Sequence, residues 1–164
     1  MADMVTGIFK NRRAADNAVE QLNAAGFSER DISVLMSDET RGREFGVQDS
    51  SKAPEGAVTG AAAGGALGAL AAGLIAVGVV AVPGLGLLAA GPLLAVLAGA
   101  GAGGAAGGLL GGLVGAGVPE HEAKLLANEV ADGGILLGVY AHDDNAKQAE
   151  SILKSAGAKS VARS

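Results

Sequence analysis

An uninterrupted apolar segment in the middle of the chain restricts what this sequence can fold into. Residues 56–118 contain 20 Gly, 19 Ala, 12 Leu, 8 Val, 2 Pro, one Ile and one Thr, and no charged residue. A hydrocarbon core about 30 Å thick needs around 20 helical residues, and the stretches 57–82 and 92–118 are both long enough. We therefore predict a Gly/Ala-rich two-helix apolar hairpin that leaves and returns on the same side. The residues expected to form its turn are Pro83, Gly84 and Gly86.

Glycine recurs at every fourth position in both predicted helices. This spacing places the glycines along one helical groove without side chains, where another helix can approach to backbone contact. Such a glycine zipper predicts homo-oligomerisation, and a series of five in one register is stronger evidence than a single GxxxG pair. The zipper residues are Gly56, Gly60, Gly64 and Gly68 in the first series and Gly99, Gly103, Gly107, Gly111 and Gly115 in the second, beside a further column at Gly104, Gly108 and Gly112.

Two other interpretations of the segment stay open. Each glycine costs a helix in water about 1 kcal/mol relative to alanine, and the segment has no aromatic residue for a membrane-interface belt, so low-complexity disorder is one alternative. Its leucine and valine content argues against disorder, because it is far above that of flexible Gly/Ser linkers. The other alternative is a soluble or lipid-associated particle in which the hairpins are buried against copies of themselves.

The polar flank before the apolar segment has the pattern of half a small α+β domain. Residues 4–9 form a β-rich run, Asn11 is a candidate N-cap, and apolar residues recur after it at helical spacing. Residues 31–36 alternate as a half-buried strand does. Residues 1–36 are therefore predicted to be β-α-β, and the polar residues 37–55, which contain Gly and Pro, are predicted to be a linker.

The flank after the apolar segment, residues 119–164, is predicted to be α-β-α-β. Pro119 suits the first turn of a helix whose apolar side would carry Leu125, Leu126 and Val130. The elements that follow are a strand at 135–140, a helix after the candidate caps Asp143 and Asp144, and an edge strand at 160–162.

Together the two flanks have the elements of one ferredoxin-like α+β domain that the apolar hairpin splits in the middle. Neither flank alone offers a sizeable core, since domains below about 40 residues usually need other support. We therefore expect residues 1–36 and 119–164 to pack on each other.

All charges lie in the flanks, and both flanks are mildly acidic. Residues 1–55 hold 7 Lys/Arg and 10 Asp/Glu, residues 119–164 hold 5 and 7, and the net charge is −5. A nucleic-acid partner would require a basic stripe, and the lack of cysteine excludes a disulfide scaffold. The start of the sequence lacks the pattern of a secretory signal, and basic residues near the hairpin ends predict that both termini are cytoplasmic. These basic residues are Arg41, Arg43, Lys52 and Lys124.

No residue pattern points to catalysis, a cofactor or a metal site. His121 and His142 lack the spacing of metal ligands and are expected to be solvated. Residues 99–104 match GxGxxG, but they do not follow the strand of a βαβ unit, so the zipper explains them better. The pair Asp143 and Asp144 is interpreted as a helix cap. We therefore predict that the protein is not an enzyme.

Several short motifs resemble the bacterial general-stress-protein domain family of the heat-induced stress protein type. They lie at residues 5–9 (VTGIF), 24–27 (AAGF), 28–36 (SERDISVLM), 117–123 (GVPEHEA) and 133–137 (GGILL). The resemblance implies a ferredoxin-like domain interrupted by a glycine-rich hydrophobic segment, and a link to stress. It supplies no catalytic residues.

These observations predict a non-enzymatic, stress-associated protein of the bacterial inner membrane that homo-oligomerises through the glycine zipper, with lipid as a partner. The alternatives are a self-assembling structural protein, as a cytoplasmic assembly with buried hairpins, and a regulatory module that binds a small ligand. The last rests on fold analogy alone, and no residue identifies the ligand.

Overall fold

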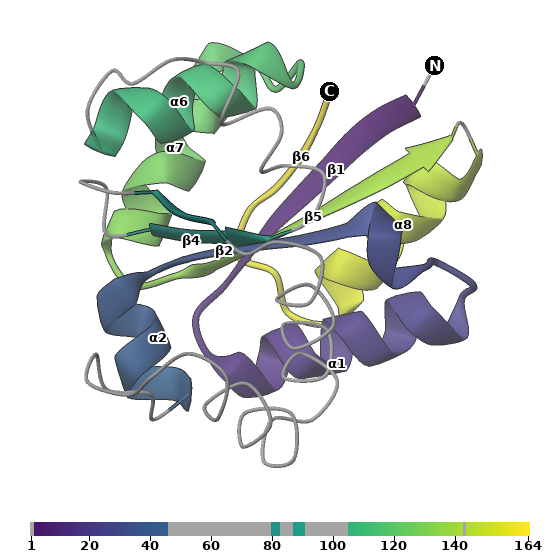
Figure 1. Ribbon diagram of the computed structural model, residues 1–164. Coiled ribbons are helices and arrows are strands. Elements are labelled where there is room, and N and C mark those ends of the chain that lie inside the picture. Colours follow the sequence, from purple (N-terminus) through teal and green to yellow (C-terminus); the bar gives the residue numbers. More distant parts are fainter. Residues whose placement is uncertain (1, 46–79, 83–86, 91–104, 143) are drawn as a thin grey trace.

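The computed structural model describes residues 2–45, 80–82, 87–90, 105–142 and 144–164, which form a six-stranded antiparallel sheet with helices on both faces (Figure 1). This is an α+β architecture. The first elements are β1 (Ala2–Phe9), α1 (Arg12–Ala24), the 3-10 turn η1 (Glu29–Asp31), β2 (Ile32–Ser37) and α2 (Asp38–Phe45). They are followed by β3 (Val80–Val82), β4 (Leu87–Ala90), α6 (Ala105–Gly115), α7 (Glu120–Ala131), β5 (Ile135–His142), α8 (Asp144–Ser155) and β6 (Val161–Arg163).

The two polar flanks interleave in the sheet. Its strand order is β3-β4-β2-β5-β1-β6, and every neighbouring pair is antiparallel. β5 from the second flank lies between β1 and β2 from the first, and it pairs with β1 from Ala2↔His142 to Phe9↔Ile135. Each flank thus supplies strands that the other flank needs as neighbours. The expectation that the flanks pack on each other is confirmed.

One face of the sheet is covered by α1 and α8 (Figure 1). The helix α1 begins where predicted, because the Asn11 Oδ1 atom accepts the backbone N–H of Ala14 at 3.0 Å. Its apolar residues at helical spacing are buried against the odd-numbered residues of β1 and β5. The buried side chains of this layer include Val5, Phe9, Ala18, Leu22, Val139 and Leu153.

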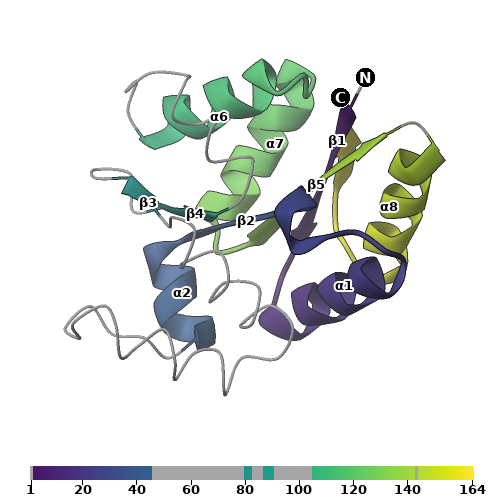
Figure 2. The same cartoon turned by 45° about the vertical axis from the view of Figure 1, so that its right-hand side comes forward.

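The opposite face is covered by α6 and α7, as the view in Figure 2 also shows. Because both faces of the sheet are buried, its central strands show no alternation of apolar and polar residues, and all of residues 135–139 are buried. The buried side chains of this second layer include Met4, Ile8, Leu35, Leu113, Leu126 and Leu136.

The prediction of a linker over residues 37–55 is wrong for its first part, because Asp38–Phe45 is helix α2. The Ser37 Oγ atom accepts the backbone N–H of Thr40 at 3.2 Å, so the last residue of β2 caps the helix. Residues 46–55 lie outside the described part of the chain.

The predicted apolar hairpin agrees with the structure only in part: Ala105–Gly115 of its second helix is helix α6, but the end of its first helix differs. The first helix was predicted to reach Val82, but Val80–Val82 is strand β3, which pairs with β4, and β4 extends the sheet at the free edge of β2. The backbone groups of that edge and the β-branched valines favour strand over helix here. Within the described part of the chain, no helix has the length and apolarity needed to cross a membrane. Residues 56–79, 83–86 and 91–104 of the predicted hairpin lie outside the described part.

The apolar side of α7 also differs from the prediction. Leu126 and Val130 are buried, together with Ala123, but the side chain of Leu125 is 57% exposed. Adjacent leucines lie about 100° apart on a helix, so helical spacing alone does not decide which of them faces the sheet.

Candidate functional site

Helix α6 has one buried face and one exposed face, and both are apolar. Leu109 and Leu113 are buried in the apolar cluster that also contains side chains of the sheet and of α7, and Gly112 is buried as well. On the other side of the helix, Gly111 and Gly115 are exposed and the side chain of Val114 is 42% exposed. The outward face of α6, defined here as these last three residues, is therefore apolar and nearly free of side chains.

The end of α6 is held in a fixed position relative to the sheet. The N–H of Val118 donates to the carbonyl of Leu113 at 3.0 Å and that of Gly117 to the carbonyl of Val114 at 3.0 Å, with Gly117 at φ +93°. These two bonds and the positive φ form a Schellman motif. A Cβ atom at Gly117 would lie 2.8 Å from the Cβ of Ser164, so only glycine fits this turn against the end of β6.

Ser164 in turn is attached to the first strand. Its backbone N–H donates to the carbonyl of Met4 at 3.0 Å, and its Oγ atom accepts the N–H of Met4 at 2.8 Å. The half-buried ring of Tyr140 packs against the same apolar layer, and burial raises the pKa of its hydroxyl. Because the turn after α6 packs against an ordered strand, the outward face of α6 is presented in one orientation.

The outward face of α6 and the neighbouring helix carry the exposed large apolar side chains of the described residues. These are Val114 on α6 and Leu125 on α7. Single exposed apolar residues are common on protein surfaces, but here both lie on the two helices of one layer. This layer is the candidate interaction surface of the chain.

The predicted zipper glycines are only partly described. Gly107, Gly111 and Gly115 lie in α6, and the last two are exposed, whereas Gly112 of the second column is buried. Neighbouring residues lie about 100° apart on a helix, so over the last turns of α6 the first column faces outward and the adjacent Gly112 turns into the buried layer. The predicted residues Gly56, Gly60, Gly64, Gly68, Gly99 and Gly103, and the turn residues Pro83, Gly84 and Gly86, lie outside the described residues.

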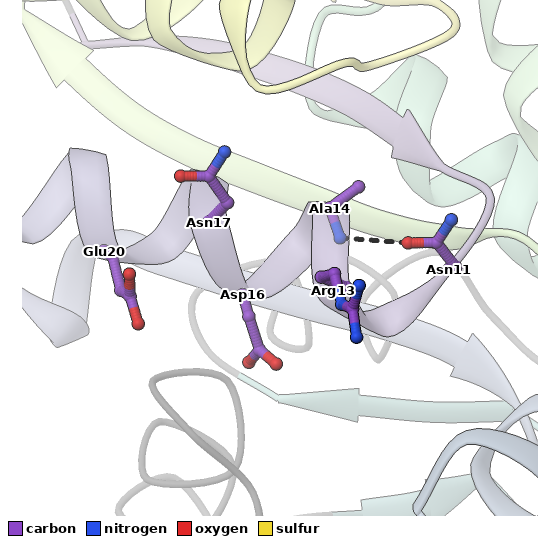
Figure 3. A pocket seen from close by; sticks show the side chains of 6 residues that line it. All are labelled: Asn11, Arg13, Ala14, Asp16, Asn17 and Glu20. Atoms are coloured by element: carbon purple, nitrogen blue, oxygen red, sulfur yellow. Dashed lines mark hydrogen bonds between the residues drawn. The ribbon is translucent and has the colours of Figure 1, made fainter.

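A shallow groove runs along α1 (Figure 3). Most of the described residues that line it have polar side chains and lie on α1, and the side chain of Asn11 accepts the backbone N–H of Ala14 as a helix cap. The lining residues are Asn11, Arg13, Ala14, Asp16, Asn17 and Glu20. The described residues that line the groove all lie on α1 and its cap, so by themselves they do not form the concave, largely apolar cavity typical of a small-molecule site.

The predicted solvated histidines lie at the surface. His121 is exposed at the start of α7, with its Nε2 atom 3.8 Å from a carboxylate oxygen of Glu122, and His142 is exposed at the end of β5. Among the residues that the structure describes, no group of three His, Cys, Asp or Glu side chains could hold a metal ion.

Sequence reasoning missed the ionic contacts at the end of α2. The Glu44 Oε2 atom accepts the backbone N–H of Arg12 at 3.1 Å, and the Arg43 Nε atom donates to Glu44 Oε1 at 3.1 Å. The bond from the Arg12 backbone, together with the charges of Arg43 and Arg12, lowers the pKa of the Glu44 carboxyl against the opposing effect of burial. The cap pattern Ser37–Thr40 was the available signal for this helix.

Residues 5–81 of the chain match the model of the heat induced stress protein YflT domain. The match covers most of β1 and all of α1, β2 and α2, and it ends within β3. It confirms the stress-family resemblance that the motifs at residues 5–36 indicated. No curated protein and no solved structure matches the chain.

Proposed function

We propose that this chain, which carries a heat-induced stress protein domain over residues 5–81, is a non-enzymatic stress-associated protein that assembles with copies of itself through α6. The observation that carries the proposal is the outward face of α6, where Gly111, Val114 and Gly115 leave an uncharged helical surface exposed.

Two such faces fit each other well. Glycines four residues apart allow two helices to approach to backbone contact, and the loss of water from the neighbouring valine adds apolar burial. Because the same face occurs on each copy, a two-fold contact would bury it on both partners at once. A charged or bulky partner surface would fit it less closely, which favours a second copy as the partner.

We also propose a ferredoxin-like architecture for the domain, split by the insert between β2 and α7. The strand order β2-β5-β1-β6, with α1 and α8 on one face, supports this assignment. A ferredoxin-like domain with only its two helices leaves one face of the sheet uncovered. In this chain, α6 and α7 cover that face. The insert would in this way contribute its last helix to the domain and its outward face to the assembly.

The test is the double substitution Gly111→Leu with Gly115→Leu, which adds bulk on the outward face without touching the buried Gly112. Size exclusion with light scattering on the full chain should show smaller particles than for the wild type, while far-UV circular dichroism stays unchanged. The matched control is Gln148→Leu, which adds one leucine at an exposed position of α8. If the double variant assembles like the wild type and the control, α6 is not the contact surface.

A second candidate is attachment of the insert to the bacterial inner membrane, with both ends of the chain on the cytoplasmic side. The absence of charge over residues 56–118 favours it. Since β4 pairs with β2 and β3 with β4, residues 80–82 and 87–90 would then stay on the same side as the flanks. Retention of the protein in membranes after an alkaline carbonate wash would support attachment, and release into the soluble fraction would exclude it in favour of a cytoplasmic assembly.

A further inference from the structure

Helix α2 joins parts of the domain that are far apart in the sequence. Two hydrogen bonds join Arg12 and Glu44. The Arg12 backbone N–H donates to the Glu44 carboxylate, and the Arg12 Nη1 atom donates to the backbone carbonyl of Glu44 at 3.2 Å. The Arg43 Nη2 atom donates to the carbonyl of Gly133 at 3.1 Å, where the chain turns from α7 into β5. The end of α2 is thus bonded to α1 from the first flank and to the second flank.

These contacts are polar and partly accessible to water. The side chain of Arg43 is 55% exposed and that of Glu44 is 19% exposed. Charged hydrogen bonds in such positions are weakened by salt, because mobile ions screen the attraction. The docking of α2 is therefore expected to depend on ionic strength much more than the apolar layers of the sheet do.

The helix itself has little intrinsic stability. It has eight residues, fewer than the roughly 12 to 15 that an isolated helix needs in water. Gly42 in its interior costs about 1 kcal/mol relative to alanine. At its start, Ser37 and the buried Thr40 fasten it to β2 through their hydroxyl groups, 2.9 Å apart. The helix is thus fixed at one end, and its other end is helical only while its ionic contacts hold.

The position of α2 in the chain gives this arrangement a mechanical consequence. In a helix its eight residues span about 12 Å, at 1.5 Å per residue. In an extended chain the same residues span up to about 26 Å, at roughly 3.3 Å per residue. Undocking would therefore more than double the distance that residues 38–45 can span from the end of β2.

We propose that α2 is a salt-sensitive latch: it undocks and unfolds as a unit while the sheet remains folded, and residues 38–45 thereby extend from the end of β2. The latch consists of Glu44, Arg43, the N-terminus of α1 at Arg12, and the carbonyl of Gly133. It does not depend on the proposed self-association, since its contacts are all within one copy of the chain.

Hydrogen exchange on the full-length protein, followed by mass spectrometry, tests the latch. The variant Glu44→Gln removes the charge, and the matched control Glu39→Gln removes a charge from an exposed position of the same helix. Loss of a charged hydrogen bond should speed exchange of the amides of residues 38–45 about tenfold. The control should speed this exchange less than Glu44→Gln does, since it loses only the attraction between an acidic residue and the first turn of the helix, and the amides of β1 and β5 should be unchanged in both variants.

Salt provides an independent arm that needs no variant. From about 0.01 M to about 1 M salt the screening length falls from about 30 Å to about 3 Å, and exchange of residues 38–45 in the wild type should accelerate while that of β1 and β5 does not. If Glu44→Gln does not fold, the question is decided by this arm and by Arg43→Gln, which loses the contact to Gly133 and the ion pair with Glu44 but keeps the bond between Glu44 and the backbone of Arg12. The latch is refuted if residues 38–45 exchange only together with the sheet, or at rates that neither salt nor these variants change.

Discussion

Replacing Leu113 with alanine should destabilise the domain by about 3 kcal/mol, whereas the same change at its neighbour Val114 should have little effect. Leu113 is 0% exposed and belongs to the layer that contains Ile8 of β1 and Leu126 of α7. Truncation of a buried leucine costs about 2–5 kcal/mol, depending on how far the surroundings collapse into the cavity. Here the Schellman turn holds the end of α6 in place, which limits collapse and places the expected cost well inside that range.

Val114 is 42% exposed, so its truncation removes little buried surface and should cost less than about 1 kcal/mol. Both variants are compared with the wild type by urea unfolding followed by far-UV circular dichroism. The measurement is repeated at several protein concentrations, because assembly makes the apparent stability depend on concentration. A loss at Leu113 of less than about 1 kcal/mol, or equal losses at both positions, would show that α6 does not pack on the sheet through this face.

Three further predictions concern single contacts. Gly134→Ala should destabilise the domain by about 1–3 kcal/mol, because its Cβ would lie 2.7 Å from the carbonyl oxygen of Glu129; an unchanged urea midpoint would contradict this close approach. Asn11→Ala should cost about 1 kcal/mol by removing the cap of α1, with Asn11→Ser as the conservative control that restores most of the loss, and equal midpoints for all three proteins would contradict the capping role. The lowered pKa of Glu44 means that its contribution is complete above its ordinary value of 4.5 and is lost as the pH falls through the lowered value in the folded state. The stability difference between wild type and Glu44→Gln should therefore shrink towards zero in acid, and a difference that grows on acidification would refute the assigned contacts.

Local patterns in the sequence predicted the regular elements of the flanks well. In α1 the positions at helical spacing, such as Ala18 and Leu22, are buried, and Asn11 caps the helix as expected. The strand predicted at residues 135–140 is β5, which continues to His142. These elements are set by interactions between residues close in the sequence, which composition and periodicity record directly.

The elements that sequence reasoning missed depend on partners far away in the chain. Helix α2 has few apolar residues to give it a periodic signal, and its end is stabilised through Arg12 and Gly133, the latter 90 residues from Arg43. Strands β3 and β4 lie in a segment whose composition suits a helix as well, and the edge of β2 decides between the two. A short stretch of sequence, over which periodicity and capping are assessed, never contains both partners of such contacts.

The sequence predicted which glycines form the candidate surface, but it did not predict which of them are exposed. Spacing identified Gly107, Gly111 and Gly115 as one column and Gly112 as a member of another. Which column meets the protein's own sheet depends on the rotation of α6 about its axis. That rotation follows from the burial of Leu109 and Leu113 and from the turn at Gly117.

The sequence by itself determined that one long segment carries no charge, that its two flanks are polar, and in which order most of their helices and strands occur. Each of these properties comes from composition or from contacts between residues a few positions apart. The tertiary structure decided that β5 lies between β1 and β2, that α6 and α7 cover the second face of the sheet, and that Leu125 and Val114 face outward. Strand pairing and layer packing join residues that are distant in the chain, and the free energy of burying both faces at once selects among arrangements that local patterns leave equivalent.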